Sequence, residues 1–371
     1  MQERAEIKLN RKLILPVLAV LLIILNIGVI KDCGLYSQPI CRITEVKTTQ
    51  LPDVSGDLGI NEKAYDQVLT CRVLNSTDKG KTLVIKNEYT ASRYNDTKYH
   101  KGDELFLREI TENPDGTIKS AVIDGQKRDY FLSILISAVI FGALLTAGRR
   151  GASFALALAA NIGVLAAGFA CFQTGVSFIL ITALFIIIFP LISLVLCIGR
   201  NRRMLASLLD TYATIGILTI VYCLFRRLSP DLDYTLQDYV RNGSLDIDLL
   251  LSCGTLIGSL GAIMDTAVSV TGGAAEMISR DPGIKTAELA GSMRNISLDV
   301  MGTMINVLFY TYMAGRIPMC IAQLANGMPV YVMFRYYMPF EIIRFLTGAV
   351  GIALSVIVSE KVILRRKVTD G

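Results

Sequence analysis

Apolar residues in this chain occur in long blocks, and they do not follow the three- and four-residue spacing of an amphipathic soluble helix. Most blocks have the roughly 17 to 25 residues that a helix needs to cross a bilayer. The blocks are residues 13–30, 130–147, 152–172, 178–198, 205–224, 249–270, 300–314 and 342–358. The pattern therefore predicts an α-helical polytopic membrane protein with about eight transmembrane helices.

Residues 31–129 have a different character, because they are rich in charge and in β-branched residues that alternate with polar ones. Turn-forming residues, including those at 78–80, 101–103 and 113–116, separate the candidate strands. The candidate strands are residues 42–49, 67–74, 81–86, 104–109 and 118–123. Five short strands favour a small β-barrel of the OB or SH3-like type.

Basic residues predict the orientation of the chain. They cluster before the first block and after the second, fourth and eighth, at Arg4, Lys8, Arg11, Lys12, Arg149, Arg150, Arg200, Arg202, Arg203, Lys361, Arg365, Arg366 and Lys367. Eight alternating spans place all of these on one side of the membrane, which the positive-inside rule identifies as the cytoplasm. The exceptions are Arg226 and Arg227, which fall outside, beside an acid-rich loop with Asp231, Asp233, Asp238, Asp246 and Asp248.

These predictions define the domains of a plasma-membrane protein with both termini in the cytoplasm. We expect a basic N-terminus at 1–12, an anchor at 13–30, an extracytoplasmic β domain at 31–129, a seven-helix membrane domain at 130–359 and a basic tail at 360–371. The anchor should stay in the protein, because no small-residue cleavage site follows its apolar run. Residues 316–340 fit an interfacial segment, a re-entrant segment or a loop.

The amino-acid composition excludes several kinds of partner and of catalytic site. Hydrophobic residues make up 52% of the chain and the mean hydropathy is +0.50, so the net charge of +5 points to anionic lipid headgroups and not to nucleic acid. The single histidine, His100, excludes a histidine zinc site or a histidine-based triad, and we expect no cofactor. Cys33, Cys41 and Cys71 lie in the β domain, where the sequence allows one disulfide and leaves its pairing open.

Two acidic residues lie in or at the edge of apolar blocks. Asp265 and Asp299 are each seventeen residues from Pro282. A helical hairpin turning at 280–283 would place both carboxylates about 25 Å from the turn, at 1.5 Å per residue, where they could face one another. An ionisable group within a membrane costs a few kcal/mol or more unless it is paired or hydrated, and it usually marks an ion or substrate pathway. A purely structural role, in which each acid bonds a neighbouring helix or reaches headgroup water, is the alternative.

Both helices of this hairpin carry a face of small or polar residues at three- and four-residue steps. The expected intramembrane site consists of Asp265, Asp299, Thr303, Asn306, Asn295 and Ser269. The expected close helix contact consists of Gly254, Gly258, Gly261 and Ala262. A further acid, Asp210, lies near the basic loop at 200–203, and there we expect a structural ion pair.

The chain resembles the YibE/F family of multispanning membrane proteins. The resemblance rests on Gly-Ser-Leu-Gly-Ala-Ile-Met-Asp at 258–265 and Asp-Val-Met-Gly-Thr-Met-Ile-Asn at 299–306, and it includes strands at 71–74 and 79–87. Where the family pattern has a Gly-Arg pair before the second acid, this chain has Ser297 and Leu298, which leaves Arg294 as the nearby cation. The resemblance implies the architecture, and it implies a permease without an assigned substrate.

Three functions remain to be compared. The first is a transporter or permease in which the two acids bind a cation, a proton or a small solute. The second is a non-catalytic envelope protein whose outer barrel binds an extracytoplasmic protein partner. The third, an intramembrane aspartyl protease, needs a Gly-x-Gly-Asp motif, and Leu298 precedes Asp299 here, so we do not expect an enzyme. The sequence does not indicate an oligomeric state.

Overall fold

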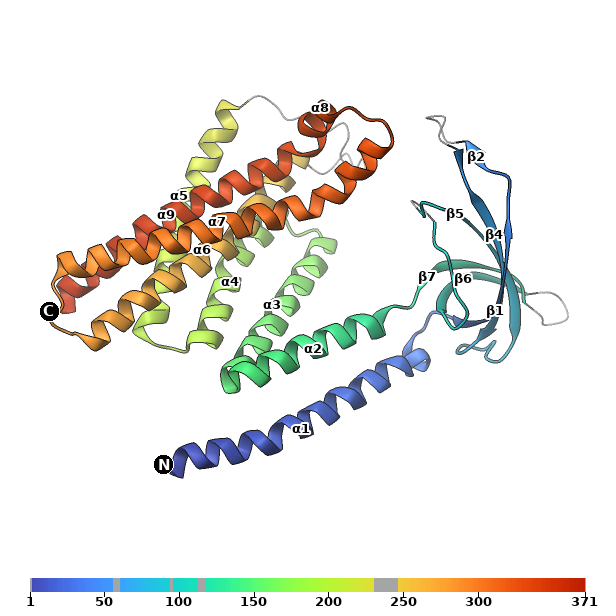
Figure 1. The fold of residues 1–371 in the computed structure, drawn as a ribbon, viewed down its shortest axis with the longest axis horizontal. Coiled ribbons are helices and arrows are strands. Elements are labelled where there is room, and N and C mark those ends of the chain that lie inside the picture. Colours follow the sequence, from blue (N-terminus) through green and yellow to red (C-terminus); the bar gives the residue numbers. More distant parts are fainter. Residues whose placement is uncertain (1, 56–60, 94–95, 113–117, 230–245, 371) are drawn as a thin grey trace. The chain divides into compact units, whose positions relative to one another are not determined.

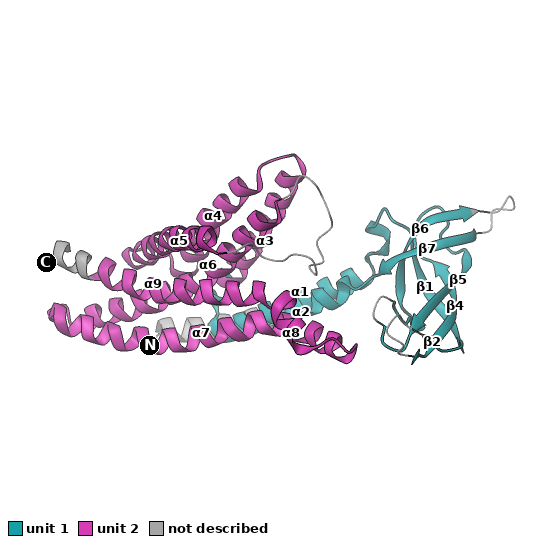
Figure 2. Ribbon diagram, turned by 90° about the horizontal axis from the view of Figure 1, so that it is seen from above, with its two compact units in different colours: residues 1–152 teal, residues 153–371 magenta. Residues whose placement is uncertain are grey.

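The computed structural model describes residues 2–55, 61–93, 96–112, 118–229 and 246–370, and the side chains of residues 16–53, 61–93, 96–111, 118–229 and 246–363. The chain divides into two compact units, residues 1–152 and 153–371 (Figure 2). Several sequence predictions fall outside the described residues. They concern the turn at 113–116, the acids Asp231, Asp233 and Asp238, and the side chains of Arg4, Lys8, Arg11, Lys12, Arg365, Arg366 and Lys367.

The first unit contains a five-stranded antiparallel sheet (Figure 1). Its strands are β1 (Ile40–Gln50), β4 (Ala64–Val73), β5 (Thr82–Thr90), β6 (Glu104–Glu112) and β7 (Ile118–Gln126), in the order β5-β4-β1-β6-β7. All five predicted strands are therefore confirmed. A separate two-stranded ribbon, β2 (Val54–Ser55) with β3 (Asn61–Glu62), was not expected.

The predicted barrel is wrong, because the sheet does not close. The outer strands β5 and β7 are not hydrogen-bonded to one another. β1 pairs with β4 along nearly its whole length, but it pairs with β6 only through Ile40, Cys41 and Arg42. One face of the sheet nevertheless buries a compact apolar core around Ile43, Leu69 and Leu105.

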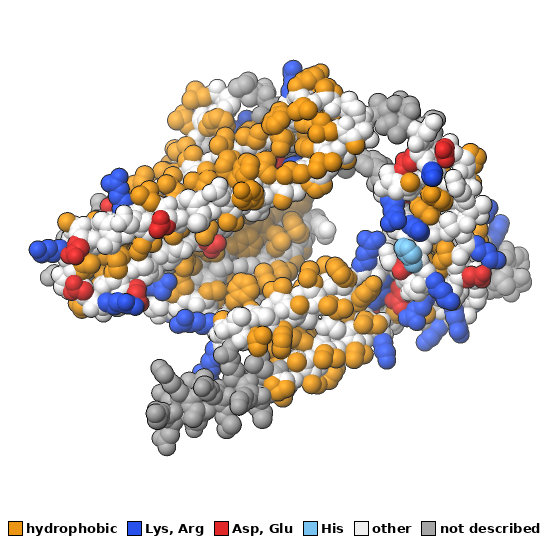
Figure 3. Space-filling model, viewed as in Figure 1, with side chains coloured by type: hydrophobic (Ala, Val, Ile, Leu, Met, Phe, Trp, Pro, Cys, Tyr) orange, Lys and Arg blue, Asp and Glu red, His pale blue; other side chains and the backbone are white. Residues whose placement is uncertain are grey.

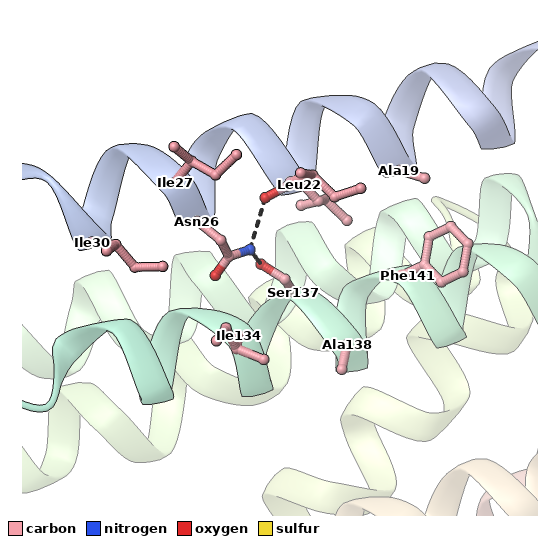
Figure 4. Close-up of a pocket in the computed structure, with 10 residues that line it drawn as sticks. Ala19, Leu22, Asn26, Ile27, Ile30, Ile134, Ser137, Ala138 and Phe141 are labelled. Carbon is pink, nitrogen blue, oxygen red and sulfur yellow. Dashed lines mark hydrogen bonds between the residues drawn. The ribbon is translucent and has the colours of Figure 1, made fainter.

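Two helices flank the sheet in the sequence and pack on each other. They are α1 (Gln2–Ile30) and α2 (Asp129–Ala147). In an otherwise apolar groove between them, the Asn26 amide donates to the Leu22 carbonyl at 2.7 Å and to the Ser137 hydroxyl at 2.9 Å (Figure 4). This polar contact fixes one helix against the other where lipid offers no hydrogen bonds.

A buried lysine connects the sheet to both helices. The Lys127 ammonium donates to Asp129 at 2.9 Å and to the Val29 carbonyl at 3.0 Å, and it pairs with Asp32 of the short helix η1 (Asp32–Leu35) at 2.8 Å. Burial disfavours the charged lysine, but the hydrogen bonds to Asp32 and Asp129 outweigh burial and raise its pKa above the ordinary value. The end of α1 and the start of α2 are thus held together by one cation.

The second unit is helical. Its elements are α3 (Arg149–Gln173, from Ser153 onward), α4 (Phe178–Ile198), α5 (Arg202–Leu228), α6 (Ile247–Arg280), α7 (Thr286–Ala325), α8 (Val330–Val332), a π-helical turn η2 (Met333–Tyr337) and α9 (Pro339–Asp370). α6 packs against α5, α7 and α9, and α7 also packs against α9 (Figure 1). The segment 316–340 contains the end of α7, the short helices α8 and η2 and the first residues of α9. Within it, Cys320, Met333 and Tyr337 are buried together.

Six helices in the described residues are long and apolar enough to cross a membrane, namely α2, α3, α4, α5, α6 and the part of α9 from Pro339 to Ile363. Their outer surfaces carry many exposed apolar side chains (Figure 3). The chain is therefore a multi-pass membrane protein. The expected eight spans are not confirmed, because the described side chains of α1 begin at Pro16 and α7 is too polar to qualify.

Candidate functional site

Among the described residues of the second unit, the most deeply buried carboxylate belongs to Asp210 on α5. This helix starts where the Asn201 side chain accepts a hydrogen bond from the Met204 backbone at 2.8 Å, which is a normal N-terminal cap. Ser207, Asp210, Thr211 and Thr214 then recur at three- and four-residue steps, and none is exposed to solvent. α5 therefore turns a polar face into the bundle, toward α6 and α9.

Hydroxyl groups from two helices surround the Asp210 carboxylate. Thr214 on α5 donates to Oδ1 at 3.1 Å, and on α9 Ser355 donates to Oδ2 at 3.4 Å. Ser359, one turn further along α9, also donates to Oδ2. Every donor is neutral, so the charge of an ionised carboxylate is solvated but not neutralised.

The expected ion pair between Asp210 and the loop at 200–203 is wrong. No Lys or Arg among the described side chains lies within ion-pair distance of this carboxylate. Arg203 lies seven residues before Asp210, which is about 10 Å along a helix, and its guanidinium packs against Gly272 of α6 instead. Proximity along the sequence did not predict where the arginine side chain lies.

More buried hydroxyls continue along α6. Ser207 and Thr271 share a hydrogen bond of 2.7 Å between α5 and α6. Thr255, Ser259 and Thr266 are fully buried, and each donates to the backbone carbonyl four residues earlier at 2.8 Å. Because each proton is used within the helix, the oxygen lone pairs of these three hydroxyls are free, within the described part of the chain, to accept a hydrogen bond or to bind a cation.

Asp265 lies elsewhere on α6 and is exposed. It lines a hollow of about 250 Å³ with side chains of α3 and α4, including Asn161 and Ser193. The Asn161 amide donates to the Ser193 hydroxyl at 2.8 Å, while its own oxygen is buried without a hydrogen-bond partner among the described residues. This arrangement gives the hollow three polar groups in an apolar wall.

The polar residues predicted on α7 lie on its exposed face. Asn295, Asp299, Thr303 and Asn306 are all exposed. Thr303 donates to the Asp299 carbonyl at 3.1 Å, and Asn306 donates to the Gly302 carbonyl at 2.9 Å, so both side chains bond their own helix. The buried face of α7 consists instead of Leu289, Met293, Ser297, Leu308, Met313 and Cys320.

The structure therefore does not bring Asp265 and Asp299 together. Asp265 lines the hollow with residues of α3 and α4, whereas Asp299 is exposed on α7 and does not line that hollow. Equal distance from Pro282 fixes the height of each residue along its helix, but it leaves the rotation of each helix about its axis undetermined. Ser269, the last residue of the predicted site, is half-buried on α6.

The predicted small residues of α6 have different surroundings. A side chain added at Gly258 would meet the Tyr312 hydroxyl of α7, and one at Gly254 would lie 3.6 Å from the Arg344 guanidinium of α9. Gly261 has no such neighbour within 4 Å, and Ala262 is half-buried. Gly254 and Gly258 thus admit polar side chains of neighbouring helices close to α6.

A family model for YibE/F-like protein matches residues 135–365, and a model for the YibE/F family N-terminal domain matches residues 34–126. The chain belongs to the YibE/F family. The first match covers α2 to α9 up to residue 365, and the second covers the sheet. No curated protein and no solved structure matches the chain.

Sequence reasoning missed a cluster of charged residues in this YibE/F chain. Glu341 at the start of α9 is buried and accepts hydrogen bonds from Arg316 Nε of α7 at 2.9 Å and Arg344 Nη1 at 3.2 Å. Arg316 and Glu341 lie at the two ends of the segment 316–340, which the hydropathy pattern did not assign to a span or a loop. Four charged residues, Arg316, Arg335, Glu341 and Arg344, in an otherwise apolar stretch were the available signal.

In the described part of this YibE/F protein, no group of three or more His, Cys, Asp or Glu side chains lies close enough together to hold a metal ion. The oxygen atoms around Asp210 form a different kind of environment. They comprise one carboxylate and neutral hydroxyls, with the Ile263 carbonyl 3.5 Å from Ser355. A proton or a small monovalent cation matches that single negative charge.

Proposed function

We propose that this YibE/F protein is a permease in which a proton or a monovalent cation binds at Asp210 and drives the movement of a solute. One observation carries the proposal. The Asp210 carboxylate is fully buried among apolar spans, with hydroxyl donors and no basic partner among the described side chains. An uncompensated buried carboxylate is unstable as an anion, so it gains a proton or a cation.

The geometry also supports a coupling mechanism. Asp210 belongs to α5, while Ser355 and Ser359 belong to α9. An ionised carboxylate accepts hydrogen bonds from these hydroxyls, whereas a protonated or cation-bound carboxylate accepts them more weakly because its negative charge is neutralised. Binding at Asp210 therefore changes the attraction between α5 and α9, which is how a bound ion can favour one arrangement of the helices over another.

The hollow at Asp265 fits the second requirement of a permease, which is a place for the solute. Its volume of about 250 Å³ and its polar groups from α3, α4 and α6 suit a small polar molecule. Met264 and Val268, which line this hollow, belong to the same helix as Thr266, which faces the buried bundle. α6 thus separates the proposed ion site from the proposed solute site.

The test is ion flux in liposomes. Purified protein is reconstituted with an internal pH-sensitive dye, and gradients of H⁺, Na⁺ and K⁺ are imposed one at a time. We expect the wild type to dissipate one of these gradients, and Asp210→Asn to abolish that flux, because an amide does not exchange a proton or neutralise a cation. Glu276→Gln is the matched control, since Glu276 is an exposed carboxylate of α6 that pairs with Arg280.

Two results contradict the proposal. The first is a folded Asp210→Asn variant with wild-type flux, and the second is a wild type that dissipates none of the gradients. The second result would favour the envelope-protein alternative, in which the sheet binds a protein partner. That alternative predicts that Asp210→Asn leaves cellular function intact while deletion of residues 37–125 abolishes it.

A further inference from the structure

The sheet of the first unit carries a hollow of about 330 Å³ where β1 and β4 meet the turn into β5. Seven residues line it, namely Arg42, Thr44, Arg72, Val73, Leu74, Lys79 and Gly80. Three of the seven are cations and none is an acid. Lys and Arg side chains are also prominent on the visible face of this sheet domain (Figure 3).

Two of the cations face each other across paired strands. The β1–β4 register places Arg42 directly opposite Arg72. Like charges in this position destabilise a sheet unless something neutralises them. Glu104, which lies opposite Arg42 on β6, neutralises one of them, with Arg42 Nη2 2.5 Å and Nε 3.2 Å from its Oε1.

The other two cations of the hollow remain uncompensated. Neither Arg72 nor Lys79 has an ion pair or a side-chain hydrogen bond within the described residues. The acid next to Lys79 in the sequence, Asp78, pairs with Lys81 at 2.6 Å. The hollow therefore holds an excess of two positive charges on side chains that are exposed to solvent.

The backbone around the hollow is fixed before any ligand binds. The Asn75 side chain, which is buried, accepts from the Ile40 backbone at 2.6 Å and donates to the carbonyls of Cys33, Tyr36 and Gln38 at 2.8 to 3.1 Å. A bulge in β1 between Ile43 and Glu45 leaves Thr44 without an opposite residue on β4, and the Thr44 hydroxyl donates to the Thr70 carbonyl at 2.9 Å. Bulges often occur beside binding sites, where they redirect a side chain.

We infer that this hollow binds a phosphate group, with Arg72 and Lys79 as its principal ligands and Arg42 at its edge. A guanidinium presents parallel N–H donors that match two phosphate oxygens, and the ammonium of Lys79 adds a compact charge. Two uncompensated cations match the one to two negative charges of a phosphate diester or monoester. The phosphate can belong to a lipid headgroup or to a soluble molecule, and the inference does not depend on the function proposed for Asp210.

The experiment measures binding to the purified full-length protein in an uncharged detergent by titration calorimetry. One arm titrates inorganic phosphate, and the other titrates short-chain phosphatidylglycerol against short-chain phosphatidylcholine. We expect saturable binding in at least one arm, and a loss of about tenfold or more in affinity for Arg72→Gln with Lys79→Gln. Binding in the first arm alone identifies a soluble phosphate, whereas binding in the second alone identifies a lipid headgroup.

The matched control is Lys86→Gln, because Lys86 is an exposed cation of β5 that does not line the hollow. It should bind as the wild type does. Absence of binding in both arms would overturn the inference, and so would an equal loss in Lys86→Gln, which would indicate general surface charge. If the double variant melts early, Lys79→Gln alone is measured, since this turn residue has no partner to lose among the described residues.

Discussion

Polar side chains recur at three- and four-residue steps on both α5 and α7, yet the two helices use them in opposite ways. On α5 the polar face of Ser207, Asp210 and Thr214 is buried and bonds to α6 and α9. On α7 the polar face that includes Asp299 and Thr303 is exposed, and Thr303 donates to a backbone carbonyl of its own helix. Spacing therefore identifies which residues share a face, but packing decides whether that face lies inside the bundle.

This contrast has an energetic consequence. A buried hydroxyl or carboxylate that loses its partner keeps the cost of its dehydration, whereas the described polar groups on the outer face of α7 have no partner on another helix to lose. Substitutions in the α5–α6–α9 interior should then reduce stability much more than substitutions on the outer face of α7.

Glu341→Ala should be the most destabilising of these changes. Glu341 is the shared acceptor of Arg316 and Arg344, and its removal leaves two half-buried guanidiniums with excess positive charge. Breaking such a pair costs about 3 to 5 kcal/mol. We expect a lower melting temperature in detergent and poor recovery of folded protein. The control is Glu276→Ala, which removes an exposed ion pair, and an equal loss there would argue against a special role for burial.

Asp210→Ala should have the next largest effect. It removes the acceptor of Thr214, Ser355 and Ser359, and each buried hydroxyl left without a partner costs about 1 to 3 kcal/mol before it relaxes. Because a serine or threonine can turn back to its own helix, we expect a net loss of about 2 to 3 kcal/mol. Chemical denaturation in micelles measures it. A variant as stable as the wild type would mean that the carboxylate contributes nothing to the packing of α5 against α9.

The sequence predicted local features of the fold well. All five strands of the sheet and six of the eight spans follow from residue alternation and apolar block length, which are properties of neighbouring residues. Closure of the sheet is not such a property. It depends on whether the two outer strands, β5 and β7, pair with each other, and they are not hydrogen-bonded to one another.

The site was harder to predict for the same reason. The partners of Asp210 on α9 lie 145 and 149 residues later in the chain, at Ser355 and Ser359. No spacing rule connects residues so far apart, and small hydroxyls in an apolar block look like ordinary packing residues. Asp265 and Asp299 were predicted to form the site because their symmetry about Pro282 is visible in the sequence, but only Asp265 lines the hollow with residues of α3 and α4.

The glycines of α6 give a smaller effect with an internal control. A leucine at position 258 would displace the Tyr312 hydroxyl, whereas one at 261 meets open space. Overpacking costs about 1 to 3 kcal/mol, and both variants gain the same helix propensity, so their difference reports the clash alone. We expect Gly258→Leu to melt earlier than Gly261→Leu. Identical melting would show that Tyr312 moves aside freely and that this contact does not hold α6 to α7.

Asp299→Ala should have the smallest effect of all. The Asp299 side chain is exposed and has no hydrogen bond or ion pair within the described residues, so its removal should change the free energy of unfolding by no more than about 0.5 kcal/mol. The measurement is the same denaturation used for Asp210→Ala, on protein whose mass in the micelle is determined by light scattering. An effect as large as that of Asp210→Ala would break the comparison. It would mean that the polar face of α7 is covered in the assembled protein, because lipid cannot satisfy those groups and another protein surface must do so.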